Sequence, residues 1–172
     1  MNHAAVIIEP ETPADVQPMD HLLRAVFPEP AEAELVRTLR AAGDVQLSLV
    51  ARITDELVGA VIFSRVELHT PTGVVAGTIL APVAVAAAHQ RCGIGSRLIR
   101  HGLQSLEQSG WAFAVVLGET EFYGRFGFNT EAATRIVSPW NGPYWQAIIW
   151  QRDAMPRVST NLSFPSAFAA LG

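Results

Sequence analysis

Apolar positions recur along the chain with two periods, and each period predicts one kind of element. Alternation with period two, or a short continuous apolar run, predicts strands over residues 4–9, 45–53, 57–69, 74–85, 111–118, 144–151 and 157–164. Helical spacing and helix start and stop signals predict helices over residues 13–27, 31–42, 94–109, 119–125 and 165–171. The chain of 172 residues is therefore expected to form one domain that mixes strands and helices, residues 1–172.

The order of these elements predicts a sheet. Three consecutive strands over residues 45–85 are joined by short turns, which indicates an antiparallel meander. The run 111–118 is apolar throughout, as expected of a strand buried on both faces and parallel to its neighbour, so it completes a right-handed βαβ unit. We expect an α/β (α+β) fold with a mixed, mostly antiparallel sheet of about six or seven strands, flanked by helices. Pro82 cannot donate a ladder hydrogen bond, which predicts a bulge or a local gap in pairing.

Composition and charge narrow the class of protein. The chain is 49% hydrophobic and 16% charged, as in globular domains, and no apolar run approaches the roughly 20 residues that span a membrane. Glu9 and Pro10 come too early for a signal peptide, and the one cysteine, Cys92, suits a reducing compartment, so we expect a cytoplasmic protein. The net charge of −4 argues against nucleic-acid binding. The five histidines show no metal-ligand spacing, so no metal site is expected.

The turn between strand 74–85 and the next helix carries the candidate chemistry. It reads Gln90-Arg91-Cys92-Gly93-Ile94-Gly95, with two glycines where a helix begins. The free N–H groups and the dipole of a helix start form an anion site, most simply for a phosphate. Such glycines are also common in ordinary turns, and Cys92 could be a nucleophile only with a histidine that the sequence does not place. A dinucleotide-binding Rossmann domain is disfavoured by the antiparallel meander and by the lack of a third glycine.

Two motifs together resemble a known family. The string QRCGIG resembles the Q/R-x-x-G-x-G/A phosphate loop of the Gcn5-related N-acetyltransferases (GNAT), and Phe122 to Phe128, FYGRFGF, resembles their Y-x-R-F-G-F signature. The motifs span about residues 80–128, and the predicted element order matches that of the GNAT family over nearly the whole chain. The sequence of this stretch is similar to a bacterial subgroup of predicted N-acetyltransferases. The resemblance implies the GNAT fold, with a cofactor core at about residues 77–128, and acetyl-coenzyme A as cofactor.

Residue roles follow from the resemblance. It implies that the pyrophosphate lies on the loop and helix start, that the pantetheine arm pairs with the strand before the loop, and that arginines add positive charge. The cofactor-binding residues so implied are Val83, Ala84, Val85, Gln90, Arg91, Cys92, Gly93, Ile94, Gly95, Ser96 and Arg97, with Arg100 as a further cation. It also implies that Tyr123 is the general acid that protonates the leaving thiolate.

The general base is the open question. An alkylamine with a pKa of about 10.4 is uncharged about once in 10^3.4 molecules at pH 7, a deficit of about 4–5 kcal/mol that a base would reduce. Many members of the family carry a glutamate for this purpose on the strand before the loop, but residues 77–83 contain no carboxylate. The candidates are Glu29, Glu34, Glu67 and His69. Glu34 is favoured, because its helix borders the acceptor site in the family, and activation through ordered water is the alternative.

The predicted function is transfer of an acetyl group from acetyl-CoA to a primary amine of a small molecule or a protein. The alternative is a GNAT-fold module that binds acyl-CoA as a sensor with little catalysis. The identity of the acceptor does not follow from the sequence. Trp140, Trp145 and Trp150 line either an acceptor pocket or the core, or they form the face of a homodimer.

Overall fold

The computed structural model describes residues 4–171 of the chain. The strands are β1 (Val6–Pro10), β2 (Val45–Ile53), β3 (Glu56–Thr70), β4 (Gly73–Val85), β5 (Phe113–Leu117), β6 (Ile136–Val137), β7 (Trp145–Ile149) and β8 (Thr160–Ser163). The α-helices are α1 (Val16–Val26), α2 (Ala31–Ala42), α3 (Ile94–Gln108) and α4 (Thr120–Gly124). Short 3₁₀ helices are η1 (Pro13–Asp15), η2 (Ala87–His89), η3 (Arg152–Ala154) and η4 (Ser166–Leu171).

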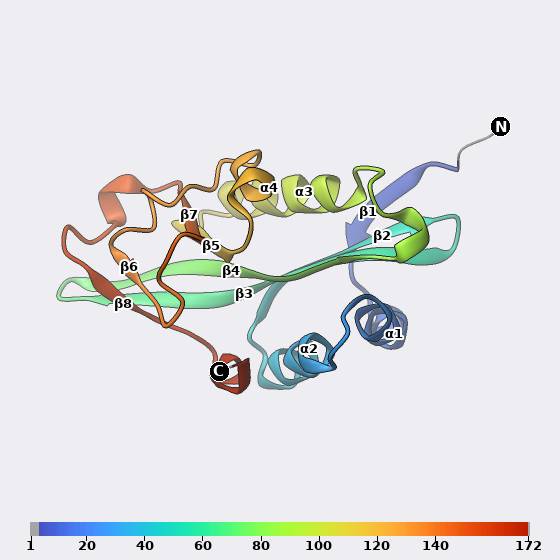
Figure 1. Ribbon diagram of the computed structural model, residues 1–172. Helices are drawn as coiled ribbons and strands as arrows, with labels where there is room; N and C mark the ends of the chain where they lie inside the picture. Colours follow the sequence, from blue (N-terminus) through green and yellow to red (C-terminus); the bar gives the residue numbers. More distant parts are fainter. Residues whose placement is uncertain (1–3, 172) are drawn as a thin grey trace.

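One sheet runs through the molecule, with helices on both faces (Figure 1). Its strand order is β1-β2-β3-β4-β5-β7. Outside this order, β8 pairs with both β3 and β6. All pairs along the main path are antiparallel except β4 with β5, which is parallel. Helices α3 and α4 cover one face, and α1, α2 and η4 lie on the other (Figure 1). The antiparallel meander and the parallel βαβ unit that the sequence predicted are both confirmed.

The apolar stripes of the helices explain these layers. The inward face of α3 buries five residues at helical spacing: Ile94, Leu98, Ile99, Leu103 and Leu106. On the opposite face of the sheet, Leu35 and Leu39 of α2 pack with Phe168 of η4. Gly102 lets α3 approach the sheet closely, because a Cβ at this position would lie 2.3 Å from the ring of Phe63.

Most predicted elements are present, with their ends shifted by at most three residues. The strand β6 was not predicted, since two residues give no periodic signal. The bulge expected at Pro82 is present: Val83 faces Val61 and Leu80 faces Phe63, so two residues of β4 oppose one of β3. The mixed, mostly antiparallel sheet flanked by helices is therefore as predicted, with eight strands among the described residues.

The pairing of β4 with β5 ends early, and this feature positions the site. Strand β4 pairs with β5 only over Gly77–Ile79, although β4 continues to Val85. Beyond Ile79, β4 remains paired with β3 on its other side. The edge of β4 that faces away from β3 is thus left without a strand partner among residues 4–171, between the helix start of α3 and the end of β5.

Candidate active site

The loop before α3 has the backbone shape that an anion site requires. Arg91 and Gly93 both have left-handed backbone, with φ of 61° and 81°. The side chain of Gln90 donates a hydrogen bond from Nε2 to the Val85 carbonyl at 2.9 Å, which ties the loop to the end of β4. Helix α3 starts at Ile94, so the N–H groups of Ile94, Gly95 and Ser96 have no acceptor within the helix. Their partial positive charge is directed at the cavity in front of the loop.

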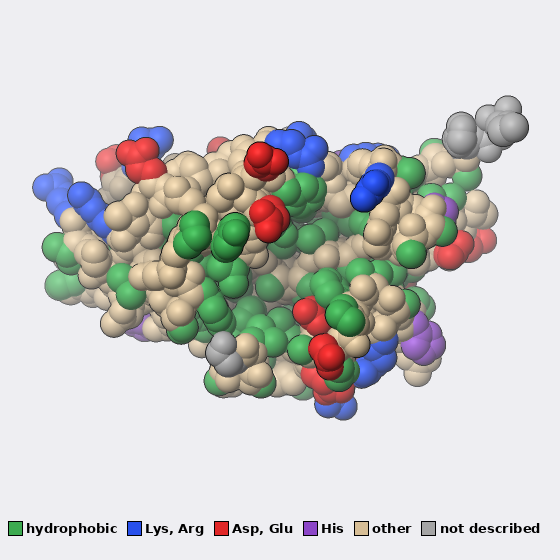
Figure 2. Space-filling model, in the orientation of Figure 1, with side chains coloured by type: hydrophobic (Ala, Val, Ile, Leu, Met, Phe, Trp, Pro, Cys, Tyr) green, Lys and Arg blue, Asp and Glu red, His purple; other side chains and the backbone are tan. Residues whose placement is uncertain are grey.

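Two cavities continue one another along the unpaired edge of β4. The first, of about 490 Å³, is lined by the residues that meet at the loop: Val26, Phe27, Val83, Ala84, Val85, His89, Gln90, Arg91, Gly93, Ile94, Gly95, Ser96, Phe122 and Arg125. The second, of about 340 Å³, is lined by Phe27, Glu32, Leu35, Ile79, Leu80, Ala81, Pro82, Val83, Leu117, Tyr123, Trp140, Phe168 and Leu171. Phe27 and Val83 line both, so the two cavities adjoin along β4, and we call the pair the β4 channel. In the space-filling view, hydrophobic side chains gather in a hollow above α2 (Figure 2).

Tyr123 stands in the second part of the β4 channel and is fixed by its packing. Its ring makes edge contacts with the rings of Phe122 and Phe128, at centroid distances of 4.9 and 5.8 Å. Gly118 makes room for it, since a Cβ there would lie 2.3 Å from the Tyr123 ring. Burial raises the pKa of Tyr123 from its ordinary 10.0 to about 12. The phenol is therefore protonated at neutral pH and can act only as a proton donor.

This pKa can be checked by titration. In the Tyr144→Phe variant, Tyr123 is the only tyrosine, and at pH 10.5 it should be about 3% ionised, against about three-quarters at the ordinary pKa. Since the folded-state pKa is raised, the stability from burying the neutral phenol is complete below about pH 10 and is lost as the pH rises to about 12. Phenolate absorbance should appear near pH 10 only after unfolding in urea. The same midpoint in the folded variant would contradict burial of the phenol.

The predicted arginines lie in different places relative to the β4 channel. Arg91 lines the loop end of the β4 channel together with Arg125, whose guanidinium lies 4.8 Å from the Phe122 ring and within 3.4 Å of the Ser96 hydroxyl. Arg97, in contrast, donates to the Val6 carbonyl at 3.1 Å on strand β1. Arg100 stacks over Phe126. The Arg97 side chain thus lies toward β1 and not among the residues that line the channel, and its role in cofactor binding stays a prediction. Arg125 was not predicted, although it lies inside the FYGRFGF motif.

Among the four candidates for the general base, none lines the β4 channel. Glu34 pairs with Arg24 at 3.1 Å and with Arg37, on the exposed side of α2, so the structure does not bring it to Tyr123. Glu67 and His69 pair with one another on the distant half of β3, and the hydrogen bond from Arg65 holds the pKa of Glu67 below its usual range. Glu29 is exposed between α1 and α2. The carboxylate that does line the channel is that of Glu32.

Glu32 was missed because the sequence gives it no distinguishing signal. It is one of two glutamates in the first turn of α2, where acidic residues are common for their favourable interaction with the helix dipole.

The three C-terminal tryptophans lie in different environments, which the sequence did not distinguish. Trp140 lines the β4 channel, whereas Trp145 is buried in the core and donates from Nε1 to the Ile136 carbonyl at 2.8 Å. Trp150 packs against the core beneath α3.

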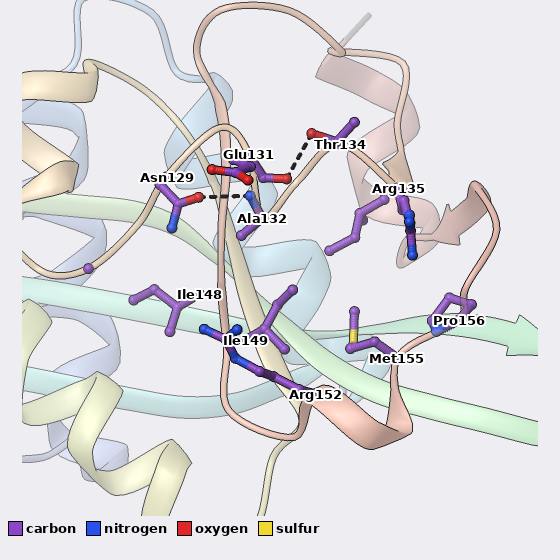
Figure 3. Close-up of a pocket in the computed structure, with 12 residues that line it drawn as sticks. Asn129, Glu131, Ala132, Thr134, Arg135, Ile148, Ile149, Arg152, Met155 and Pro156 are labelled. Atoms are coloured by element: carbon purple, nitrogen blue, oxygen red, sulfur yellow. Dashed lines mark hydrogen bonds between the residues drawn. The ribbon is translucent and has the colours of Figure 1, made fainter.

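A further cavity lies away from the β4 channel, between β7 and the loop that follows Phe128 (Figure 3). It has a volume of about 670 Å³ and an apolar floor that includes Ile148, Ile149 and Met155. Hydrogen bonds from the Ala132 N–H to Asn129 Oδ1 and from the Thr134 hydroxyl to the Glu131 carbonyl fold its rim (Figure 3). Of the two predicted motifs, only Gly127 near the end of FYGRFGF reaches this cavity, whereas the glycine loop before α3 and Tyr123 line the β4 channel. We therefore assign the chemistry to the β4 channel.

Comparison with known proteins identifies the family. A family model described as an acetyltransferase (GNAT) domain matches residues 8–130. The chain is 36% identical over 138 residues to the uncharacterized N-acetyltransferase YhbS of Escherichia coli K12, covering 80% of this chain and 81% of that protein. It is 32% identical over 127 residues to the uncharacterized N-acetyltransferase YjhQ of the same strain, covering 72% and 70% of the two proteins.

Solved structures agree with these matches. The structure of Escherichia coli YhbS in complex with CoA superposes with a TM-score of 0.90 at 31% identity, over 100% of this chain and 96% of that one. A GNAT family acetyltransferase from Brucella melitensis in complex with acetyl-CoA gives a TM-score of 0.81 at 32% identity, over 96% and 99% of the two chains. The chain therefore belongs to the GNAT acetyltransferase family, and it is an acyltransferase of the GNAT fold, as the two motifs predicted.

Two other expectations concern membranes and metals. In residues 4–171, none of the helices has both the length and the apolar character needed to cross a membrane. The same part of the chain holds no group of three histidine, cysteine, aspartate or glutamate side chains arranged to bind a metal ion. Cys92 is exposed, with its thiol 3.4 Å from the Gln90 carbonyl, and it does not line the β4 channel.

Proposed function

We propose that this protein transfers an acetyl group from acetyl-CoA to a primary amine of a small molecule or a protein. The observation that supports this most directly is the β4 channel itself. It runs from the helix start of α3, along the unpaired edge of β4, to the protonated Tyr123. These three features suit a phosphate group, an arm that carries amides, and a thioester, in the order in which acetyl-CoA presents them.

The residues of the channel fit acetyl-CoA at each point. The N–H groups of Gly93 to Ser96, which line the channel, would hold the pyrophosphate together with the backbone N–H of Cys92 just before them, and Arg91 and Arg125 would add positive charge at the same end. The free backbone edge of Val83, Ala84 and Val85 would pair with the amides of the pantetheine arm, as an added strand does. The bulge at Pro82 lies just before these residues, and Pro82 and Val83 line the same cavity as Tyr123. An arm paired with Val83 would therefore end in the cavity that holds Tyr123.

The chemistry required of the protein is then limited. Acetyl-CoA supplies a thioester with a thiolate leaving group. Tyr123 would hold the proton that this thiolate takes up, and the apolar lining would exclude water that could hydrolyse the thioester. The amine must lose one proton before it attacks, which is the task left for a carboxylate.

Binding and turnover test the proposal separately. In calorimetry, acetyl-CoA should bind and NAD should give no signal, since the channel ends at a thioester position rather than in a nucleoside pocket. Release of free thiol from acetyl-CoA should depend on an added primary amine. Absence of acetyl-CoA binding would refute the proposal. Binding without amine-dependent thiol release, over a broad panel of amines, would favour the alternative of an acyl-CoA-binding sensor module.

The proposal includes a cellular location and an oligomeric state. We infer a cytoplasmic location, which suits the exposed thiol of Cys92. The homodimer considered from the C-terminal tryptophans stays a prediction. With Trp145 in the core and Trp140 in the channel, these two side chains do not form a free face, and sedimentation measures the oligomeric state directly.

A further inference from the structure

We propose that Glu32 binds the ammonium group of the acceptor and removes its proton, and that the acceptor is a primary amine carried on an apolar, aromatic-sized body. This inference rests on the proposed acetyl transfer and names the substrate class and the base of that reaction. It depends on the second part of the β4 channel, beyond the point where the cofactor arm would end.

The position of the Glu32 carboxylate is the first observation. Glu32 lies in the first turn of α2 and lines the same cavity as Tyr123. Its atom Oε2 is buried and accepts no hydrogen bond from any described residue. Native proteins seldom leave a buried carboxylate oxygen without a donor, because the loss of hydration is not compensated. An ammonium group of the acceptor in the cavity would pair with this carboxylate and supply the opposite charge that the cavity lining lacks.

The charge of the cavity is the second observation. Of the thirteen described residues that line it, Glu32 is the one with a charged side chain. A single carboxylate matches an acceptor with a single cationic amine. A polyamine or an aminoglycoside would bring two or more ammonium groups into an apolar cavity, where each unpaired charge is strongly disfavoured.

The apolar wall opposite β4 is the third observation. Leu35 of α2, Trp140, and Phe168 and Leu171 of η4 form this wall. The ring of Trp140 stands edge-on to Phe164 at 5.1 Å and to Phe168 at 6.4 Å, so the aromatic surface is held in place by its neighbours. An apolar body of the acceptor would be desolvated against this wall, at about 25 cal/mol for each Å² removed from water.

The transfer balances with these groups. Glu32 takes one proton from the ammonium group and later releases it to solvent. The neutral nitrogen attacks the thioester carbonyl, a C–N bond forms, and the C–S bond breaks. The leaving thiolate takes the proton of the Tyr123 hydroxyl, and the phenolate takes the remaining excess proton from nitrogen. The products are the amide and free thiol, with one proton released to solvent, and Tyr123 and Glu32 return to their starting states.

A panel of amines tests the substrate class. The kcat/KM for 2-phenylethylamine, tryptamine and octylamine should exceed that for spermidine, glucosamine and a lysine peptide by at least about 10-fold, as the burial of one aromatic ring against the wall would give. Equal values, or a preference for the hydrophilic amines, would overturn the assignment of the acceptor. If no amine supports thiol release, the proposed function fails first, so the two failures are distinguishable.

Substitution of Glu32 tests the role of the carboxylate. In Glu32→Gln, kcat/KM for 2-phenylethylamine should fall about 10²-fold, while the affinity for acetyl-CoA stays within twofold. The β,β-difluoro analogue has the same shape but a weakly basic nitrogen that is largely uncharged at neutral pH. Its kcat/KM should fall less than about 10-fold, because no proton has to be removed before the attack. An equal loss for both amines, or no loss for either, would exclude Glu32 as the base.

The same substitution at Glu34 is the matched comparison. Glu34 lies two residues away on α2, and its carboxylate pairs with Arg24 and Arg37. A large loss in Glu34→Gln with none in Glu32→Gln would overturn the inference. The melting temperature gives a second readout: Glu32→Gln should leave it unchanged or raise it, since a buried oxygen without a partner contributes no stability, whereas loss of a structural contact would lower it.

Discussion

Tyr123→Phe should lower amine-dependent thiol release by about 10²–10⁴-fold and leave acetyl-CoA affinity within about twofold. The substitution removes the hydroxyl that would protonate the leaving thiolate but keeps the ring that packs against Phe122, Phe128 and Gly118. The structure should therefore be preserved, and the loss should appear in kcat rather than in cofactor binding. Steady-state kinetics with a thiol reagent and calorimetry with acetyl-CoA measure the two quantities.

The chain contains a suitable control for this experiment. Tyr144 is the second of two tyrosines, it is 50% exposed, and it does not line the β4 channel. Tyr144→Phe should retain turnover within about twofold. If Tyr123→Phe turned over as fast as the unchanged protein, Tyr123 would not be the acid. Protonation of the thiolate by solvent would then be sufficient.

Gly93→Asp should weaken acetyl-CoA binding by at least about 10²-fold. A carboxylate at this position would stand among the N–H groups that are proposed to hold the pyrophosphate. At 4 Å and an effective dielectric constant of 20, two like unit charges repel by about 4 kcal/mol, which corresponds to about 10³-fold in affinity. The left-handed backbone of Gly93, with φ of 81°, adds a cost in stability of about 1–2 kcal/mol.

Gly43 separates these two effects. It caps α2 with φ of 76°, close to that of Gly93, and a Cβ would meet open space at both positions. Gly43→Asp should lose at least as much stability in urea unfolding, because a carboxylate is unfavourable at the C-cap of α2 and favourable at the N-cap of α3, while acetyl-CoA affinity is unchanged. Gly93→Ala, which adds the strain without the charge, should bind more tightly than Gly93→Asp. Equal affinity in Gly93→Asp and in the unchanged protein would remove the loop from the phosphate site.

The features that the sequence predicted are those that depend on neighbours along the chain. Alternation at residues 45–53 and the helical stripe from Ile94 to Leu106 are local patterns, and each was sufficient to predict its element. The anion site likewise depends on local geometry, since the glycine turn and the helix start are consecutive. The bulge at Pro82 followed from the missing N–H of one residue. The family could be inferred because QRCGIG and FYGRFGF are contiguous motifs.

The features that it did not predict depend on which faces meet in space. Glu32 and Glu34 are equivalent in sequence, two glutamates in one helical turn. The packing of α2 against η4 and the sheet places Glu32 in the channel and leaves Glu34 beside Arg24 and Arg37. The directions of the Arg97 and Arg125 side chains were likewise not predictable, because the direction of a long side chain is set by its contacts, here with β1 and with Phe122.

The sequence by itself determined the elements, their order, the glycine turn at the start of α3 and the acyltransferase class, because these features are encoded in short contiguous stretches. Only the tertiary structure decided where β4 and β5 separate, which carboxylate lines the same cavity as Tyr123, and which tryptophan lines the channel. The physical reason is that the channel is built from α1, α2, α3, α4, β4, β5 and η4, and the burial of each side chain in it depends on how these elements pack on one sheet.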